Sequence, residues 1–294
     1  MARPLNTIVI PAAGQGTRLM RTTRVTAKEM LPVYDAPMLQ FAMDEATASG
    51  VKRVVIVISA NKLAIRDYLA PRDATTRPQS DPQALQKSGG LEVIFAYQDA
   101  PLGLGHAIFC AEPHMLPGPF GVILPDDVIF GVPCLAEMAD AYPGGHMVAA
   151  MTVPVEETSR YGIFRQFDGT TGSLIAVSGM VEKPELGTAP SRLAAVGRYI
   201  LDPSIFGTLD QTKIGVGGEM QLTDAINTDA RRLPLTAFRF SGRRFDCGNL
   251  DGLLEAANAR QAQLRRREAY ITRLPALNGL RPRPAPQDAQ HTRA

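Results

Sequence analysis

The sequence has little cysteine and no long hydrophobic run, and each absence excludes a class of protein. Three cysteines stand among 294 residues without a Cys-x-x-Cys spacing, which excludes a disulfide scaffold of the secreted type. This cysteine usage predicts a reducing, cytoplasmic location. No apolar run approaches the roughly 20 residues that a membrane-spanning helix needs, so no membrane segment is expected. A Gly-Gln-Gly loop follows too early for a signal peptide.

The sequence also lacks an excess of charge of either sign. Its formal net charge is +2, so it has no general attraction to nucleic acid or to a membrane surface, and we expect neither as a partner. Hydrophobic residues make up 45% and charged residues 20% of the chain, as in an ordinary globular protein. A chain of roughly this length buries about 75% of its unfolded surface, so it needs no cross-links to fold.

The residue sets of nucleophilic catalysis are missing as well. No Ser-His-Asp arrangement is visible, and His106 and His114 have no metal-ligand spacing to another histidine or cysteine. We interpret His106 as a structural residue at the start of a helix. Phosphoryl transfer is compatible with these absences, because positioning and charge neutralisation supply most of its catalysis.

A glycine loop after a strand is the first feature that is present. Residues 8–18 read IVIPAAGQGTR: an apolar run, then small residues, then Thr17 and Arg18, with Lys28 soon after. Glycine lets the backbone approach a ligand closely, and the cations that follow suit phosphate. Leu19 stands where a dinucleotide fingerprint needs its third glycine, which excludes a dehydrogenase of that type, and the P-loop Gly-Lys-Ser/Thr is absent. Alone, the loop is equally compatible with a tight turn.

Strands and helices alternate along the first half of the chain and predict a mostly parallel α/β sheet. In the second half of the chain, most of the expected elements are strands, and a long helix is expected at the C-terminal end. Expected strands cover residues 8–10, 54–59, 92–97, 120–124, 147–153, 161–167, 174–182, 193–201 and 235–240. Expected helices cover residues 38–49, 62–69, 106–111, 132–141, 203–209, 221–231 and 250–270. Residues 71–90 are predicted to form a polar surface loop.

Polar residues gather where the expected strands end: Gly14–Arg18, Gln98–Gly105, Asp126, Asp127, Glu182, Lys183 and Asp246. In open α/β sheets, ligands bind beyond the carboxyl ends of the strands. Asp126, with Asp246 as a second ligand, could hold Mg²⁺, which takes one or two carboxylates and phosphate oxygens. Lys183 could present a point charge to a phosphate. Each feature taken alone also fits a turn, a helix cap or a surface ion pair.

With these residues placed, the sequence resembles the bacterial UTP–glucose-1-phosphate uridylyltransferases, a family of sugar nucleotidyltransferases. The resemblance covers about residues 7–269. Its motifs, in family order, are PAAGQGTR, KEMLPV, GLGHA, LPDD, YGI, VEKP, VGRYIL, GGEMQLTDAI and DCGN. It implies the reaction of UTP with glucose 1-phosphate to give UDP-glucose and pyrophosphate, with Mg²⁺ as cofactor.

The resemblance also implies residue roles. The nucleotide-binding residues would be Ala12, Ala13, Gly14, Gly16, Thr17, Glu29, Gln98 and Gly103, of which Glu29 and Gln98 would hydrogen-bond uracil. The catalytic residues would be Arg18, Lys28, Asp126 and Lys183, with Asp126 and Asp246 as the metal ligands. The sugar-binding residues would be Asp127, Gly162, Glu182 and Lys183.

The fold implied is α/β: a Rossmann-like mixed, mainly parallel sheet flanked by helices, with a smaller β-rich sugar-binding part. We expect one domain over residues 1–272, with a nucleotide-binding part over 1–155, a sugar-binding part over 156–245 and a C-terminal helix over 250–270. Residues 273–294 are expected to be a disordered tail. The expected assembly is a homodimer or homotetramer.

Two alternatives are weighed on particular residues. Glucose-1-phosphate thymidylyltransferases share the fold and the metal aspartates, but usually have Gln after the first lysine and GLAQA, where this chain has Glu29 and GLGHA. Non-catalytic regulatory paralogues tend to lose the Thr-Arg of the first loop, whereas Thr17 and Arg18 are present. Ala36, at a position where relatives usually have lysine, and a short 71–90 connection leave assembly and regulation open.

Overall fold

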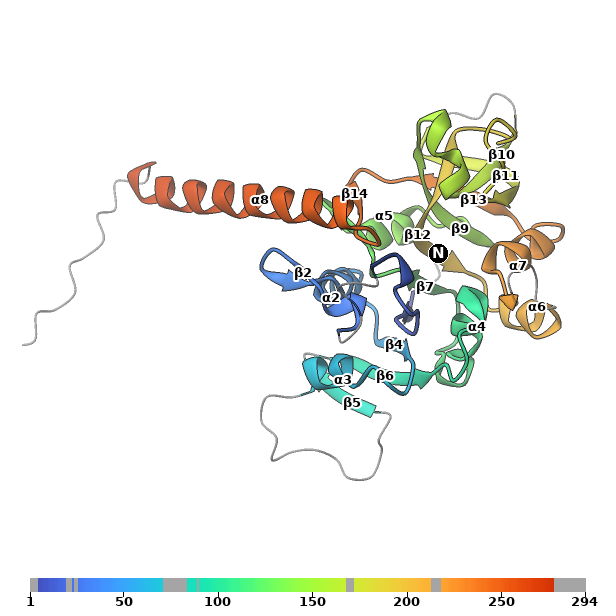
Figure 1. The fold of residues 1–294 in the computed structure, drawn as a ribbon, viewed down its shortest axis with the longest axis horizontal. Helices are drawn as coiled ribbons and strands as arrows, with labels where there is room; N and C mark the ends of the chain where they lie inside the picture. Colours follow the sequence, from blue (N-terminus) through green and yellow to red (C-terminus); the bar gives the residue numbers. More distant parts are fainter. Residues whose placement is uncertain are drawn as a thin grey trace, which may run out of the picture.

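The computed structural model describes residues 5–19, 23, 26–70, 84–88, 90–167, 172–212 and 218–277 (Figure 1). Its strands are β1 Thr7–Pro11, β2 Pro32–Val33, β3 Ala36–Pro37, β4 Arg53–Ile58, β5 Ala84–Ser88, β6 Leu91–Tyr97, β7 Phe120–Ile123, β8 Asp127–Phe130, β9 His146–Thr152, β10 Gly162–Gln166, β11 Leu174–Glu182, β12 Leu193–Leu201, β13 Leu235–Arg239 and β14 Arg243–Asp246. Its α-helices are α2 Met38–Ala48, α3 Leu63–Leu69, α4 Gly103–Phe109, α5 Cys134–Ala141, α6 Ile205–Gln211, α7 Leu222–Asp229 and α8 Leu250–Leu277. Short 3₁₀ turns cover Thr17–Leu19, Lys28–Met30, Glu112–His114 and Val155–Arg160.

The strands form one mixed sheet in the order β10-β11-β13-β9-β12-β7-β1-β4-β6-β5. Strands β7, β1, β4 and β6 run parallel, as expected from the alternation of strands and helices in the first half. The description "mainly parallel" does not extend to the second half, because β12 lies antiparallel between β7 and β9. The second half therefore continues the same sheet in mixed orientation.

Helices cover both faces of this sheet, and alternation along the strands decides which side chain meets which layer. In β1, Ile8 and Ile10 pack in a core with α2, α3 and α5, whereas Val9 packs in a second core with α4, α6 and α7. The side chains of Ile8, Val9 and Ile10 are all fully buried. A strand covered on both faces reads as a continuous apolar run, which is why it was visible in the sequence.

A smaller sheet and a third core lie outside these layers. Strand β8 pairs with β14, and β2 pairs with β3. The core includes Val128 from β8, Phe245 from β14 and Ala256 from α8. Helix α8 packs against β14 at its beginning and then extends away from the rest of the described chain (Figure 1). Its first turn is capped by Asn249, whose Oδ1 accepts from the Gly252 N–H at 2.9 Å.

Most expected elements are confirmed to within a few residues, and the differences have local causes. Helix α4 begins at Gly103 rather than His106, because the glycine-rich PLGLG run was interpreted as a loop. Strands β8 and β14 were not predicted as separate strands, because four-residue strands carry little periodic signal. Within the expected 71–90 loop, residues 84–88 form β5, and the remaining residues except Gly90 lie outside the described part.

The end of the chain also differs from expectation. Helix α8 runs to Leu277, past the predicted start of the disordered tail at residue 273. The boundary had been placed on composition, yet arginine and leucine are good helix formers and continue the helix. Residues 278–294, the rest of the expected tail, lie outside the described residues, as do Asp168 and Gly169 between the expected strands 161–167 and 174–182, where the sequence pattern also predicts a turn. The division near residue 155 remains a prediction.

Among the described helices, none combines the length and the apolar character that crossing a membrane requires.

A buried ion pair joins α2 to the central sheet. Arg198 in β12 is 2% exposed, and its guanidinium donates two hydrogen bonds to Glu45 Oε2, at 2.8 and 3.0 Å. Glu45 Oε1 also accepts from the Leu135 N–H at 3.0 Å, and Arg198 donates to the Leu124 carbonyl at 3.2 Å. The pair therefore holds the end of β7, directly before Asp126.

We expect Glu45→Ala to lower the free energy of unfolding by about 3 kcal/mol, because removal of one partner leaves the other charge buried and unpaired. The matched control is Asp44→Ala, an exposed aspartate one residue earlier in the same helix. Urea denaturation at pH 7 measures both. A Glu45→Ala midpoint equal to that of Asp44→Ala would show that the pair contributes no stability.

Candidate active site

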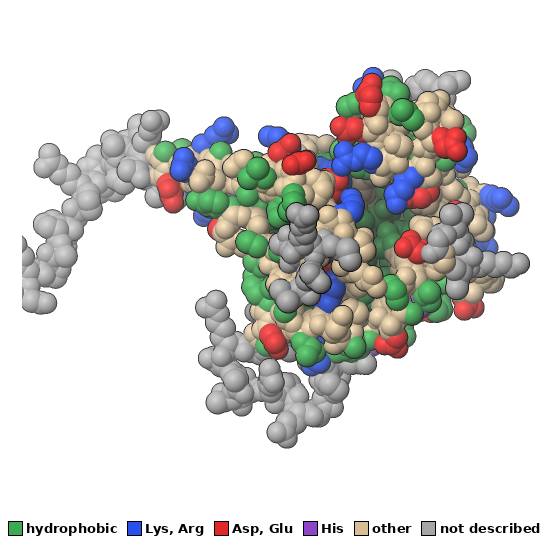
Figure 2. All heavy atoms as spheres, in the orientation of Figure 1, with side chains coloured by type: hydrophobic (Ala, Val, Ile, Leu, Met, Phe, Trp, Pro, Cys, Tyr) green, Lys and Arg blue, Asp and Glu red, His purple; other side chains and the backbone are tan. Residues whose placement is uncertain are grey.

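A cavity of about 600 Å³ opens beyond the carboxyl ends of the parallel strands. Its wall includes the loop after β1, the loop after β6 and the turn after β7 on one side, and β10, β11 and β12 on the other. Figure 2 shows a hollow near the middle of the visible face, with Lys and Arg side chains along its rim. Predicted residues that line the cavity are Ala13, Gly14, Gly16, Thr17, Arg18, Lys28, Gln98, Gly103, Asp126, Asp127, Gly162, Glu182 and Lys183.

The first wall is the glycine loop. Gly16 has a φ of 65°, a backbone conformation that favours glycine, and its carbonyl accepts from the Thr23 hydroxyl at 3.2 Å. The chain then turns through Thr17–Leu19 and directs Arg18, whose side chain is 64% exposed, along the cavity. The loop therefore combines a close backbone approach with an accessible positive charge.

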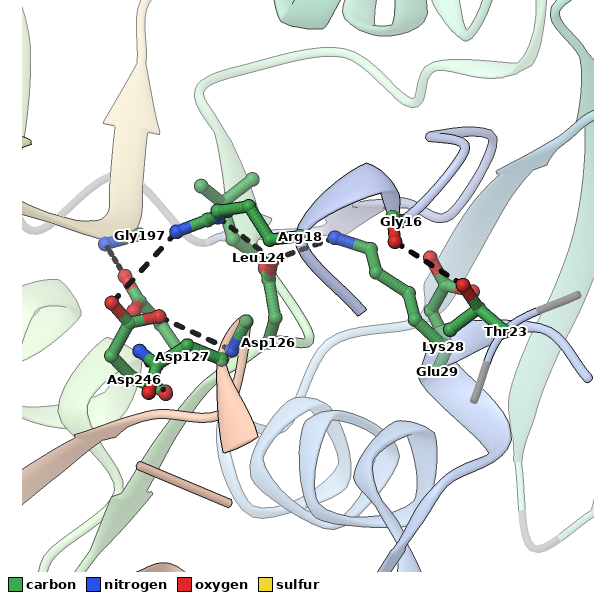
Figure 3. Close-up of polar contacts among 12 residues, drawn as sticks. Gly16, Arg18, Thr23, Lys28, Glu29, Leu124, Asp126, Asp127, Gly197 and Asp246 are labelled. Atoms are coloured by element: carbon green, nitrogen blue, oxygen red, sulfur yellow. Dashed lines mark hydrogen bonds and ion pairs between the residues drawn. The ribbon is translucent and has the colours of Figure 1, made fainter. Parts of the chain in front are cut away.

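Two aspartates from distant parts of the chain meet because β8 pairs with β14. The register places Asp127 opposite Asp246, and the Cys247 N–H donates to the Asp126 carbonyl at 2.8 Å. Arg18 lies between the two acids, with guanidinium nitrogens 3.9 Å from Asp126 Oδ2 and 3.9 Å from Asp246 Oδ2 (Figure 3). Asp246 does not itself line the cavity. It contacts Arg18 and Arg160, and both of these side chains do line it.

Lys28 sets the charge state of Asp126. The Lys28 ammonium donates to Asp126 Oδ2 at 2.6 Å (Figure 3). Burial alone would raise the pKa of Asp126, but the charge and hydrogen bond of Lys28 hold that pKa below its usual value. Burial would likewise lower the pKa of Lys28, yet Asp126 and Glu29 hold it above the usual value. Both groups are therefore charged at neutral pH.

The donor set suits a hard divalent cation. Asp126 and Asp246 offer carboxylate oxygens at one place, and the described residues contain no cluster of three or more His, Cys, Asp or Glu side chains that would surround a metal. Mg²⁺ is usually bound by one or two carboxylates, with water and substrate phosphate oxygens completing the octahedron. The residues present fit that mode of binding.

Asp127 has a different environment from its neighbour. Its Oδ2 accepts from the Gly197 N–H at 2.7 Å, and its Oδ1 accepts from Arg244, whose Nε lies at 2.7 Å. Arg244 also donates to the Tyr161 hydroxyl at 3.0 Å. Asp127 thus lines the cavity while it joins β8, β12 and β14, and its predicted contact with the sugar remains a prediction.

The opposite wall carries the VEKP segment. Glu182 lies opposite Gly162 in the β10–β11 register, and its Oε2 accepts from the Thr223 hydroxyl at 2.9 Å. Lys183 has a φ of 41°, a conformation rare for a residue with a side chain, and its N–H donates to the Tyr161 carbonyl at 3.0 Å. Strain of this kind costs about 1–3 kcal/mol and occurs preferentially at functional sites. The Lys183 side chain is 66% exposed.

The loop after β6 supplies Gln98 and Gly103. Gly103 has a φ of 92°, and a Cβ atom there would lie 2.8 Å from the Glu219 Cβ. The Gly105 N–H donates to the Met220 carbonyl at 2.9 Å, and the Met220 N–H donates to the Leu102 carbonyl at 2.7 Å. Glycine is therefore required where this loop packs against residues 218–223.

Two residues expected to contact the nucleotide lie outside the cavity lining. Ala12 is buried, does not line the cavity, and its N–H donates to the Val57 carbonyl at 2.7 Å. Glu29 is 0% exposed and also lies outside the lining, because both its carboxylate oxygens accept from Lys62 Nζ, at 3.0 and 2.8 Å. Burial raises the pKa of Glu29, against the attraction of Lys62 and Lys28. Its partner in the structure is Lys62, and its contact with the base remains a prediction.

The chain is similar to known proteins over most of its length. Residues 7–263 match the family model described as nucleotidyl transferase. The chain belongs to the nucleotidyl transferase family.

Relatives and solved structures agree with this membership. The chain is 36% identical to UTP–glucose-1-phosphate uridylyltransferase YngB of Bacillus subtilis over 87% of this chain and 90% of that protein. It is 38% identical to UTP–glucose-1-phosphate uridylyltransferase of Pseudomonas aeruginosa over 85% of this chain and 94% of that protein. A crystal structure of UDP-glucose pyrophosphorylase complexed with UDP-glucose superposes with a TM-score of 0.78 at 35% identity, covering 88% of this chain and 99% of that chain. The mixed α/β fold is therefore that of the nucleotidyl transferases.

Several residues of this nucleotidyl transferase site were missed in the sequence. Arg160 donates to Asp246 Oδ2 at 3.2 Å, and Tyr161 lines the cavity beside it. Arg244 binds Asp127, and Glu219 lies against Gly103. The sequence offered one clue to them, their nearness to predicted site residues. Arg160 and Tyr161 directly precede Gly162, and Arg244 lies two residues before Asp246. No spacing rule assigns them a partner.

We expect Lys62→Met to destabilise this nucleotidyl transferase by about 3 kcal/mol at pH 8, because Glu29 loses its buried partner. The loss of Lys62 raises the pKa of Glu29 further above its unfolded value, and a group with a raised folded pKa gains stability as the pH falls. The difference in free energy of unfolding between Lys62→Met and the unsubstituted chain should therefore become smaller as the pH falls from 8 to 5. Urea denaturation measures this difference.

The double variant Glu29→Gln/Lys62→Met should recover much of the loss, since no buried charge remains. Lys52→Met, at an exposed lysine, is the control and should change stability by less than about 0.5 kcal/mol. A Lys62→Met deficit that grows on acidification would contradict the role given to Glu29.

Proposed function

We propose that this chain transfers a uridylyl group from UTP to glucose 1-phosphate and releases pyrophosphate. The observation that carries the proposal is the cavity in which Lys28, Arg18 and Asp126 on one wall lie opposite Glu182 and Lys183 on the other. One set suits a nucleoside triphosphate with a divalent cation, and the other suits a sugar phosphate. Two of the curated relatives described above carry the same activity in their names.

On the nucleotide side, we assign the base to Gln98 and Gly103, and the ribose and phosphates to Ala13, Gly14, Gly16 and Thr17. Arg18 and Lys28 neutralise the triphosphate. Lys28 is pre-oriented by Asp126, so little reorganisation is needed when the substrate binds.

On the sugar side, we assign the hydroxyl groups to Glu182, Asp127 and Gly162, and the phosphate to Lys183. A phosphate oxygen of glucose 1-phosphate attacks the α-phosphorus of UTP in line, a new P–O bond forms, and the bond to the β-phosphate oxygen breaks as pyrophosphate leaves. No enzyme nucleophile takes part. The chain contributes orientation and positive charge around the developing negative charge.

We propose Asp126 and Asp246 as the residues that hold Mg²⁺. When bound, Mg²⁺ supplies charge neutralisation at the phosphoryl oxygens. Lys28, Arg18 and Arg160 contact these two carboxylates and would lie beside the ion and the substrate phosphates. Among these three, Arg160 was not expected from the sequence.

Two further expectations remain proposals. A cytoplasmic location is supported by the three cysteines, Cys110, Cys134 and Cys247, all of which are free thiols. A homodimer or homotetramer stays a prediction, because the structure holds one chain.

We expect pyrophosphate release from UTP and glucose 1-phosphate to require Mg²⁺ and to fall at least a hundredfold in Asp126→Asn. Arms with dTTP and with galactose 1-phosphate test the choice of base and sugar. Asp140→Asn, at an exposed aspartate of α5, is the matched control and should retain activity. Faster turnover with dTTP than with UTP would favour a thymidylyltransferase, and an active Asp126→Asn would remove the metal role.

Lys183→Ala should raise the KM for glucose 1-phosphate about tenfold or more and change the KM for UTP less than about twofold, because the lysine charge is assigned to the sugar phosphate alone. Steady-state kinetics, with each substrate varied in turn, measure the two KM values. Lys52→Ala removes a lysine far from the cavity and serves as control. Equal increases in both KM values would place Lys183 elsewhere.

A further inference from the structure

Behind the cavity wall, His106 contacts the residue assigned to the base. Gln98 is 5% exposed, and its Nε2 lies 3.1 Å from the Gly103 carbonyl oxygen and 2.9 Å from His106 Nδ1. Gln98 and Gly103 line the cavity, whereas His106 does not. His106 therefore acts on the cavity only through the Gln98 amide.

These contacts allow one orientation of the Gln98 amide. The Gly103 carbonyl oxygen can only accept, so the amide nitrogen must face it. The second amide hydrogen then points at His106 Nδ1, which must carry a lone pair, and the proton of the neutral ring lies on Nε2. Both amide hydrogens are used inside the protein.

The amide oxygen is consequently the atom left for a ligand. No group in the described part of the chain donates to Gln98 Oε1, and no fully buried side-chain oxygen or nitrogen in that part lacks a partner. Oε1 is therefore accessible, and Gln98 lines the cavity. An amide held in this way presents an acceptor and no donor.

We propose that His106 is a positioning residue for base selection, an inference that rests on the proposed function. Uracil presents an N3–H donor between two carbonyl oxygens, which matches a fixed acceptor. Cytosine presents a lone pair at N3, which a fixed acceptor repels. By holding the Gln98 amide hydrogens away from the cavity, His106 favours UTP over CTP without touching the nucleotide. Thymine shares the N3–H, so the device does not separate UTP from dTTP.

The neighbourhood of His106 is consistent with a fixed ring. Cys110 Sγ lies 3.8 Å from Nδ1 and 3.9 Å from Nε2, one helical turn further along α4. His106 is half-buried on this helix, between the lining residues Leu104 and Ala107. Helix α4 thus contributes Leu104 and Ala107 to the cavity lining, and its His106 contacts the Gln98 amide.

The test compares kcat/KM for UTP and CTP, with glucose 1-phosphate, in variants at this position. His106→Leu removes the acceptor, and the UTP-to-CTP ratio should fall about fivefold or more, with the KM for glucose 1-phosphate unchanged. His106→Asn places an amide oxygen where Nδ1 lies and should keep the ratio within about threefold. His114→Leu removes the other half-buried histidine of this region, which does not contact Gln98, and should leave the ratio unchanged.

Equal losses with UTP and CTP in His106→Leu would overturn the proposal, as would a His106→Asn ratio as low as that of His106→Leu. If thermal melting shows that His106→Leu does not fold, His106→Met, a flexible apolar replacement, takes its place. The unsubstituted chain is assayed first. Absence of turnover with UTP and glucose 1-phosphate there rejects the proposed function, whereas turnover with an unaltered ratio in His106→Leu rejects only the role of His106.

Discussion

The short antiparallel ladder between β8 and β14 is the constraint on which the candidate site depends. Its register places Asp127 opposite Asp246, and the backbone bond from Cys247 to Asp126 continues it by one step. Because both strands pack into the third core with α8, the ladder is held from behind by apolar burial. Without it, two carboxylates that are 120 residues apart in the chain would have no reason to face the same guanidinium.

Charge balance is the second organising feature of the cavity. Carboxylates are costly to bury alone, and three of those near the cavity are paired with a cation: Asp126 with Lys28, Asp127 with Arg244, and Glu29 with Lys62. The pairs differ in accessibility. Lys28 and Asp126 line the cavity, whereas Glu29 and Lys62 lie behind the lining and support the turn that carries Lys28. Lys28 and Glu29, which are adjacent in the sequence, therefore have different tasks.

The close packing of residues 218–223 connects the two sides of the cavity. The Met220 backbone bonds to the loop that carries Gly103, and Thr223 donates to Glu182. The segment therefore touches the groups assigned to the base and to the sugar. Its position explains why Gly103 tolerates no side chain, since a Cβ atom there would collide with Glu219.

Much of the fold was predictable from the chain, because buried parallel strands such as residues 54–58 are continuous apolar runs and amphipathic helices such as α2 repeat at three and four residues. The polar residues at the strand ends were also visible, and Asp126, Gln98 and Lys183 do line one cavity. Strands β8 and β14 were missed because four residues carry too little pattern.

The sequence by itself determined the kinds of elements, their order, and which polar side chains follow a strand. Only the tertiary structure decided which of those side chains meet. Glu29 turns to Lys62, Asp127 turns to Arg244, and the Gln98 amide turns its hydrogens to Gly103 and His106. Local patterns follow from the period of a helix or strand, whereas these pairings depend on how loops and layers pack against one another.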